Sequence, residues 1–318
     1  MIHHVFANKS NIGDWLSAQG IQSLLGKYVR QEYVLEHFCD EPFVPATLEA
    51  LSQADVNDLV IIGGGGLFMD YFTPFWEGFL PISGRVPFCI WGVGYCDAKH
   101  RDSRPPSRLL ETLVRRAQFC SVRDDLSRHY LASCSVPAAV TCPSVCVLES
   151  ATEYGHGLLY VDAYDNMGEH SYQQTVALLQ QFATLSGRGY RQVNNCIQAG
   201  SNMELERMLD AYRQSDLVVS SRLHGCIIAL ALGKKVLAIS GDRKVESFMA
   251  RAGLGQWVVD AANVQAIPEH LNGIEQQGSV QEFIDTSRQD NALLGRKVEH
   301  LLTEGAQQPS ASHHAVKS

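Results

Sequence analysis

The chain of 318 residues lacks a long hydrophobic run. None of its segments reaches the roughly 18 apolar residues that a membrane-spanning helix needs, because glycines or the pair Lys234 and Lys235 interrupt the apolar stretches. Residues 1–7 lead directly into polar residues and lack the pattern of a signal peptide. These absences predict a cytoplasmic protein without a transmembrane segment.

The chain also lacks an excess of basic residues. Its 26 Lys and Arg face 34 Asp and Glu, which gives a formal net charge of −8. Because nucleic-acid binding needs a broad basic face, we expect no nucleic-acid partner, although one local positive pocket remains compatible with this charge. Hydrophobic residues make up 45% of the chain, so it can build substantial cores, and its length suits two domains of about 150 residues.

Two binding patterns are absent. Cys142 and Cys146 are the one close cysteine pair, and no second pair stands at metal-ligand spacing, so we expect no metal site. The odd total of nine cysteines favours reduced, mostly buried thiols over a disulfide framework. The four glycines at 63–66 do not have the G-x-G-x-x-G spacing that binds a dinucleotide, so no NAD or other cofactor is expected.

What the chain does have is an alternation of short apolar runs with helical patterns. Strands are expected at 2–6, 33–38, 58–62, 88–94, 119–122, 140–144, 157–162, 190–195, 216–219, 235–239 and 257–259. Strands that alternate with helices in this way predict an α/β fold of two Rossmann-like parallel-sheet domains that face each other across a cleft. We expect an N-terminal domain at 1–150, a C-terminal domain at 151–305 and a disordered tail at 306–318.

The most informative stretch is Ser-Ser-Arg-Leu-His-Gly at 220–225, between a strand and an apolar helix. Such a turn lies at the carboxyl end of its strand, where open α/β sheets bind ligands. Arg222 and His224 would stand there beside the first N–H groups of the helix, which favours an anion site with a proton-transfer group. In the alternative interpretation, the His224 imidazole is only hydrogen-bonded to the neighbouring loop.

Other polar residues follow or flank expected strands. Asp14 is either the N-cap of a helix or a carboxylate at the mouth of the cleft. Asp70 lies beyond the glycine run, either in an ordinary loop or facing the cleft. Arg123 follows the strand at 119–122, where it either pairs with a following aspartate or reaches a ligand. Lys244 lies in the turn after the strand at 235–239.

In chain order these motifs resemble the polysaccharide pyruvyl transferase family over roughly residues 8–255. The motifs are Asn11-x-Gly13-Asp14, the glycine run, Ser121-Val-Arg123-Asp124, Ser221-Arg222-Leu223-His224-Gly225 and the turn with Lys244. The resemblance implies a fold similar to the two-domain GT-B glycosyltransferases. It also implies that phosphoenolpyruvate is the donor substrate, that its pyruvyl group becomes a cyclic ketal on a sugar, and that phosphate is released.

The resemblance further implies which domain binds each substrate and which residues take part. The second domain would hold phosphoenolpyruvate and the first domain the acceptor sugar. The expected catalytic residues are His224, Arg222, Asp14 and Asp70. The expected substrate-binding residues are Arg123, Lys244, Ser221, Gly225, Gly64, Gly65 and Asn11. Glycines at 64 and 65 allow close backbone approach, and a histidine pKa near the working pH suits His224 for proton transfer or for stabilising the departing phosphate.

The family also implies a glycan acceptor, either free or lipid-linked, in the biosynthesis of a bacterial exopolysaccharide or another cell-surface glycan. A lipid-linked acceptor would bring the protein to the inner face of the cytoplasmic membrane. Two alternatives remain: a GT-B glycosyltransferase that uses a nucleotide sugar, and a non-catalytic glycan- or anion-binding protein. Many family members carry Asp-Pro at the exit of the last strand of the first domain. Cys142-Pro143 stands there in this chain, which suggests a variation on the acceptor side.

Overall fold

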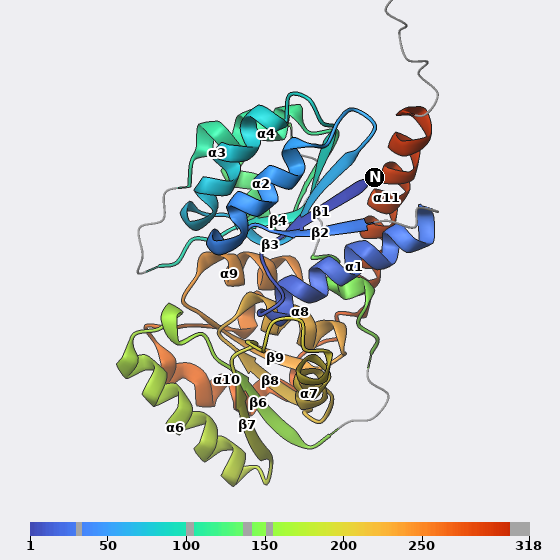
Figure 1. Cartoon of the computed structure of the whole chain (residues 1–318). Helices are drawn as coiled ribbons and strands as arrows, with labels where there is room; N and C mark the ends of the chain where they lie inside the picture. Colours follow the sequence, from blue (N-terminus) through green and yellow to red (C-terminus); the bar gives the residue numbers. More distant parts are fainter. Residues whose placement is uncertain (30–33, 100–104, 136–141, 151–154, 306–318) are drawn as a thin grey trace, which may run out of the picture.

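A computed structural model describes residues 1–29, 34–99, 105–135, 142–150 and 155–305. The expected tail at 306–318, part of the expected linker at 149–157 and the first two residues of the expected strand at 140–144 lie outside these ranges. In Figure 1 the two halves of the chain form two layered bodies, one above the other. Among the described helices, none combines the length and the apolar character needed to cross a membrane.

Each half contains a five-stranded sheet in which every pairing is parallel. The first sheet has the order β2-β1-β3-β4-β5 and the second the order β10-β9-β8-β6-β7. The strands are β1 (Ile2–Phe6), β2 (Val34–Phe38), β3 (Leu59–Phe68), β4 (Phe88–Tyr95), β5 (Cys120–Val122), β6 (Gly157–Val161), β7 (Gly189–Val193), β8 (Leu217–Ser220), β9 (Lys235–Ser240) and β10 (Val258–Asp260). This confirms the predicted pair of Rossmann-like domains.

Helices cover both faces of each sheet (Figure 1). They are α1 (Ile12–Tyr28), α2 (Val44–Ser52), α3 (Thr73–Ile82), α4 (Ser107–Arg116), α5 (Asp125–Tyr130), α6 (Glu169–Leu185), α7 (Asn202–Arg213), α8 (Leu223–Ala231), α9 (Arg243–Arg251), α10 (Ile267–Gly273) and α11 (Gln281–Gly305). Pro143–Cys146 forms a short 3-10 helix, so the described part of the expected strand at 140–144 is not a strand.

Helix α1 belongs to the cores of both domains. Its N-cap is Asn11, whose side chain accepts a hydrogen bond from the Gly13 N–H, so Asp14 lies inside the first turn and is not the cap. Trp15 near the start of α1 packs in the core of the second domain, whereas Leu24 packs in a cluster with strands of the first. The helix therefore fixes its own first turn at the junction between the two domains.

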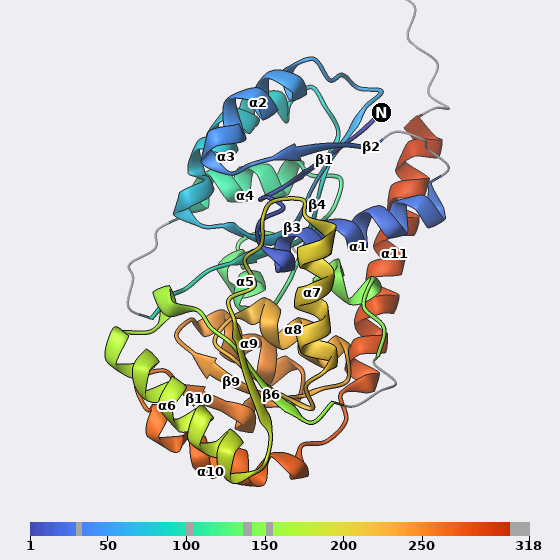
Figure 2. The same ribbon diagram turned by 60° about the horizontal axis from the view of Figure 1, so that its bottom comes forward.

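Helix α11 begins in the second domain and returns to the first, so that it runs beside both (Figure 2). Leu294 and Val298 on α11 pack against α1 and the first sheet. The buried indole N–H of Trp91 on β4 donates to Asn291 Oδ1 over 2.9 Å. The division at residue 150 stays a prediction, and α11 shows that the last helix contributes to both bodies.

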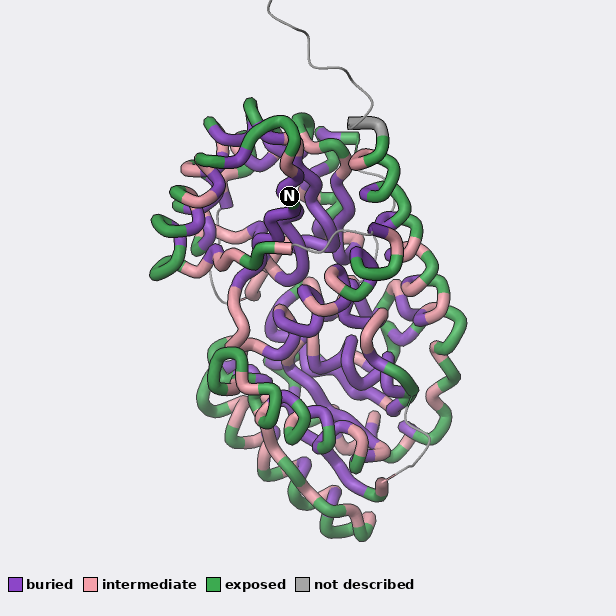
Figure 3. Tube along the Cα trace, turned by 45° about the vertical axis from the view of Figure 1, so that its right-hand side comes forward, coloured by how far each residue is buried: buried purple, intermediate pink, exposed green. Residues whose placement is uncertain are grey.

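Two isolated backbone bridges join the carboxyl edges of the two sheets. Asn11 pairs with Cys196 and Ala98 pairs with Asp242, both in the antiparallel sense. Lys99, next to the second bridge, also forms an ion pair with Glu246 on α9. Buried segments accordingly run through the middle of both halves in Figure 3. These contacts hold the two carboxyl edges face to face.

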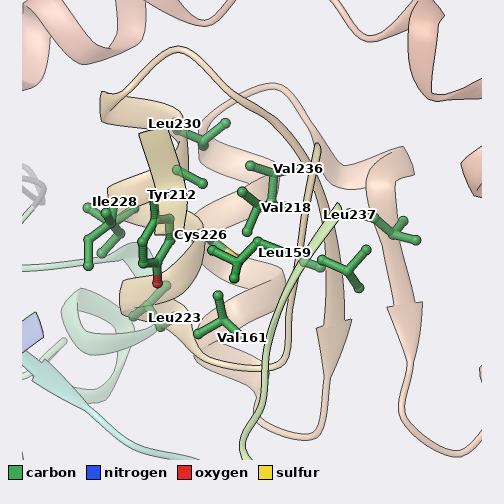
Figure 4. Close-up of a cluster of buried hydrophobic side chains, with 14 of the residues drawn as sticks. Leu159, Val161, Tyr212, Val218, Leu223, Cys226, Ile228, Leu230, Val236 and Leu237 are labelled. Carbon is green, nitrogen blue, oxygen red and sulfur yellow. The ribbon is translucent and has the colours of Figure 1, made fainter. Parts of the chain in front are cut away.

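Helix α8 is apolar on every side, and such a helix has to be buried all round. Every residue from Leu223 to Ala231 is buried except His224, whose side chain is 11% exposed. Figure 4 shows Leu223 and Cys226 on α8 among the side chains of β6 and β8. The surrounding core therefore anchors α8 and leaves the imidazole as its one polar group near an opening.

Candidate functional site

A cavity of about 240 Å³ lies where the carboxyl edges of the two sheets meet. It is lined by Asn11, Asp14, Gly66, Met69, Tyr71, Phe72, Cys96, Arg123, Asn166, Arg222, Leu223, His224 and Lys244. The strand order reverses between β1 and β3 in the first sheet and between β6 and β8 in the second. Open α/β sheets bind ligands at such switch points, and most of the lining residues directly follow these four strands.

Six of the expected site residues line this cavity together. They are Asn11, Asp14, Arg123, Arg222, His224 and Lys244. Five others are not among its lining residues: Asp70, Ser221, Gly225, Gly64 and Gly65. The rule that ligands bind at the carboxyl ends of strands thus identifies the charged residues that line the cavity. The positions of the glycines and Ser221, which do not line it, are described below.

Arg123 is a buried cation, 2% exposed, at the end of β5. Its Nε donates to Asp124 Oδ2 over 3.2 Å, and Asp124 in turn caps α5 through the Ser127 N–H. A Cβ at Gly94 would overlap the guanidinium, so the glycine at the exit of β4 gives the arginine its space. Arg123 therefore pairs with a following aspartate and also lines the cavity, whereas its contact with a ligand stays a prediction.

Lys244 has a similar arrangement on the second domain. Its Nζ lies 2.8 Å from Asp242 Oδ2 and donates to Cys96 Sγ over 3.2 Å. Burial lowers the pKa of Lys244, but its interactions with Cys96 and Asp242 raise it by more, so the net direction is upward. The ammonium is therefore charged in the cavity.

Arg222 is held differently from the other two cations. Its Nε donates to the backbone carbonyl of Asp162 over 2.6 Å, and the described residues form no ion pair with it. Arg222 is also the N-cap residue of α8, although its side chain makes no capping hydrogen bond. The guanidinium is thus held by a backbone carbonyl, and no carboxylate among the described residues neutralises it.

The contact between helix α1 and His224 requires a glycine at position 13. A Cβ at Gly13 would overlap the Cγ and Nδ1 atoms of His224, so the imidazole lies directly against the first turn of α1. As a result His224 Nδ1 is 3.9 Å from Asp14 Oδ1. The motif near the N-terminus and the motif at 220–225 thus build one site across the domain junction.

Cys142 contacts the other side of the same imidazole. Its Sγ lies 3.6 Å from His224 Nε2, and the direction of this hydrogen bond depends on the tautomer. Burial raises the pKa of the Cys142 thiol to about 11, so the group is a neutral thiol at neutral pH. The Cys-Pro that departs from the family pattern thus places a thiol against His224, and the expected variation on the acceptor side stays a prediction.

The pKa values of His224 and Asp14 are shifted in opposite directions. Burial, together with Arg123, Lys244 and Arg222, lowers the pKa of His224 well below its usual value, so the expected pKa near the working pH is wrong. Burial raises the pKa of Asp14 to about 6, although the three cations oppose this shift. The carboxyl, and not the imidazole, therefore titrates near neutral pH.

The glycine run packs against helix α1. It continues β3, where Gly64 and Gly65 have φ values of 84° and 93°. A Cβ at Gly64 would lie 2.7 Å from Ser17 Cβ, and one at Gly65 would overlap the Asp14 carboxylate. These glycines therefore make room for α1, and within the run only Gly66 lines the cavity.

Ser221 and Gly225 also make contacts that stabilise the turn between β8 and α8. The Ser221 hydroxyl accepts a hydrogen bond from the Ala163 N–H over 2.7 Å, and the residue is 1% exposed. A Cβ at Gly225 would overlap Ser220 Oγ, so the glycine lets the first turn of α8 pack onto β8. Both residues hold the turn in place from behind the cavity.

Asp70 begins a 3-10 helix, Asp70–Phe72, at the cavity wall. Its Oδ1 accepts a hydrogen bond from the Tyr71 N–H over 3.1 Å. The cavity wall is formed by its neighbours Met69, Tyr71 and Phe72.

The sequence interpretation missed Tyr71, Cys96 and Asn166. Each follows the end of a strand, β3, β4 and β6 respectively, so the rule that identified Arg123 would also have pointed to them. Within the described residues, no three His, Cys, Asp or Glu side chains are grouped to hold a metal ion. That no metal takes part stays a prediction.

Solved structures with the same fold have low sequence identity to this chain. MnaA from S. aureus, solved with UDP, is 10% identical with a TM-score of 0.53, and the match covers 97% of this chain and 98% of that one. The UDP-GlcNAc 2-epimerase of Neisseria meningitidis, bound to UDP-GlcNAc, is 10% identical with a TM-score of 0.52 and coverages of 96% and 99%. These likenesses support the GT-B-like fold alone.

An uncharacterised protein from Klebsiella pneumoniae is 14% identical with a TM-score of 0.50, and the match covers 81% of this chain and 91% of that one. No curated protein matches the chain. The family model of the polysaccharide pyruvyl transferases matches residues 11–243, a span that includes Asn11, Asp14, Arg123, Arg222 and His224. The chain therefore belongs to the polysaccharide pyruvyl transferase family and is a transferase.

Proposed function

We propose that this protein transfers the pyruvyl group of phosphoenolpyruvate to a polysaccharide or its precursor and releases phosphate. The observation that carries the proposal is the convergence of Arg123, Arg222 and Lys244 on one small cavity that also contains Asp14 and His224. Family membership supports the pyruvyl transfer. The donor, the ketal product and a lipid-linked acceptor in the cytoplasm are parts of the proposal.

The three cations suit the charges of phosphoenolpyruvate. This donor carries a carboxylate and a phosphate on a three-carbon frame, and guanidinium groups bind such anions in a bidentate manner. Arg123 and Lys244 are pre-positioned by Asp124 and Asp242, so little side-chain entropy is lost when the anion binds. Arg222, which has no carboxylate partner among the described residues, supplies the charge that is least neutralised before binding.

The reaction proceeds in two steps, and both involve proton transfer. One acceptor hydroxyl adds through its oxygen to C2 of the donor and gives up its proton to a base, while C3 takes a proton and becomes a methyl group. A second hydroxyl then forms another bond to C2 and loses its proton as the C2–O bond to phosphate breaks. The products are a cyclic ketal and inorganic phosphate, so a general base and a general acid are both required.

Asp14 suits the base and His224 the acid. Asp14 comes from the first domain, on the proposed acceptor side, and its raised pKa makes it a stronger base than an exposed carboxylate. The cations that lower the pKa of His224 are those that the donor's phosphate and carboxylate would neutralise. Donor binding would therefore raise the pKa of His224 and let it hold the proton that goes to C3 or to the departing phosphate.

The alternative of a glycosyltransferase that uses a nucleotide sugar has the fold likeness as its only support. The non-catalytic alternative is not retained, because the family is one of transferases.

We expect phosphate release to require both phosphoenolpyruvate and a glycan acceptor, and to fall about 100-fold or more in Arg222→Ala and in His224→Ala, since these groups stabilise charge and transfer a proton. A coupled phosphate assay over a panel of acceptors measures this. Arg128→Ala, at a half-exposed surface arginine, is the matched control and should keep full activity. Near-normal turnover in both site variants with an intact fold would refute the assignment.

Replacing Gly13 tests the contact between α1 and His224. In Gly13→Ala the new methyl group overlaps the imidazole and displaces it, so we expect turnover to fall about 100-fold. Gly26→Ala is the control on the same helix, because a Cβ there meets nothing within 4 Å. That variant should keep its activity and gain about 0.5–1 kcal/mol of stability from helix propensity. Equal turnover in the two variants would contradict the proposed geometry.

The raised pKa of Asp14 predicts a pH dependence. If Asp14 is the base, its carboxylate form is the active one, so kcat/KM for phosphoenolpyruvate, which reports the free enzyme, should fall as the pH drops through about 6. Asp14→Asn should lower kcat/KM about 100-fold and abolish this acidic limb in the residual activity. The profile is measured by initial rates between pH 4.5 and 8.5. A limb that persists unchanged in Asp14→Asn would assign it to another group.

A further inference from the structure

Tyr71 is an exposed aromatic residue on the cavity wall. Its side chain is 45% exposed although it lines the cavity. Among the described large hydrophobic residues that are exposed, Tyr71 alone lines this cavity. An aromatic ring left open beside a polar cavity has a face available for a ligand.

The position of the Tyr71 ring is fixed by its neighbours. It packs edge-on against Phe72, with ring centroids 4.9 Å apart and an interplanar angle of 87°. Phe72 is itself 6% exposed and belongs to the core of the first domain. Since the ring is held by a buried partner, it can receive a ligand at a low cost in side-chain entropy.

Polar groups of the same cavity complement this ring. Asp14 lies on the first-domain side, where it contacts Gly65 of β3. Tyr71 follows Gly65 by six residues. Asn166, at the end of the 3-10 helix Tyr164–Asn166, lines the cavity from the second domain and offers an amide donor and acceptor. Sugar rings have an apolar C–H face and a rim of hydroxyl groups, and this combination matches both features.

The volume of the cavity suits the small donor better than a glycan. About 240 Å³ lies below the roughly 300–1,000 Å³ typical of sites for drug-sized ligands, so a three-carbon anion fits inside but a glycan does not. The glycan therefore has to approach from outside, with only its reacting hydroxyl groups near the cations. A sugar ring that approaches the cavity from outside would contact a partly exposed residue of its wall such as Tyr71.

We propose that Tyr71 is the stacking platform for the sugar ring of the acceptor, with the reacting hydroxyl groups directed toward Asp14 and Asn166. This proposal rests on the proposed function and adds the acceptor subsite to it. Tyr71 thereby determines acceptor affinity without taking part in donor binding. A pyranoside ring of any glycan that presents an apolar C–H face is the ligand class it selects.

The test compares Tyr71→Ala and Tyr71→Phe with a matched control, Phe43→Ala. Phe43 is 46% exposed, ends the 3-10 helix Glu41–Phe43 of the same domain and packs edge-on against Phe38 at 5.4 Å, but it does not line the cavity. Saturation-transfer NMR with methyl galactoside, glucoside and mannoside at tens of millimolar measures sugar binding. Calorimetry with phosphoenolpyruvate measures donor binding to the same proteins.

We expect at least one methyl glycoside to receive saturation on its ring C–H protons, with a Kd that rises about 10-fold or more in Tyr71→Ala. Tyr71→Phe and Phe43→Ala should keep the wild-type Kd, and donor binding should be unchanged in all variants. No glycoside signal in the wild-type protein, or the same Kd in Tyr71→Ala, overturns the platform. Failure of phosphoenolpyruvate to bind, with the glycoside pattern intact, instead refutes the proposed donor and leaves the platform standing.

Discussion

Three cations share one small cavity, and the properties of the groups around it depend on their charge. Arg123 and Lys244 each have a carboxylate partner, and Arg222 is held by a backbone carbonyl. Together with burial, their charge explains why the pKa of His224 is lowered, and it also opposes the rise in the pKa of Asp14. A bound anion would relieve this concentration of positive charge. The binding energy of such a ligand and the protonation of the groups beside it are therefore coupled.

The fold builds this site through helix α1, which is shared by both domain cores. Its first turn lies against His224 because Gly13 has no side chain, and its later turns pack with β3 and α11 in the first domain. The backbone bridges of Asn11 with Cys196 and of Ala98 with Asp242 hold the two carboxyl edges together. The cavity is thus assembled from both domains in the conformation described, with Asp14 and His224 3.9 Å apart across the junction.

The sequence predicts the architecture and the charged residues well because both follow from one physical rule. Carboxyl ends of parallel strands meet at one edge of a sheet, so Arg123 lies at that edge of the first sheet and Arg222 and His224 at that edge of the second. The three residues share one cavity because the two edges face each other. The contacts of Gly64 and Gly65 could not be predicted, because a glycine's role depends on what lies against it, and their neighbour α1 comes from another part of the chain. The lowered pKa of His224 could not be predicted for a similar reason, since it comes from burial and from cations of which Arg123 and Lys244 lie in distant segments.

The most direct test of the central claim is the change in melting temperature that ligands produce in the wild-type protein and in Arg222→Ala. If the three cations form a phosphoenolpyruvate site, this donor should raise the melting temperature of the wild-type protein in a concentration-dependent way, because it binds the folded state alone. The increase should be lost in Arg222→Ala, and UDP should have little effect on either protein. Stabilisation of the wild-type protein by UDP but not by phosphoenolpyruvate would contradict the account.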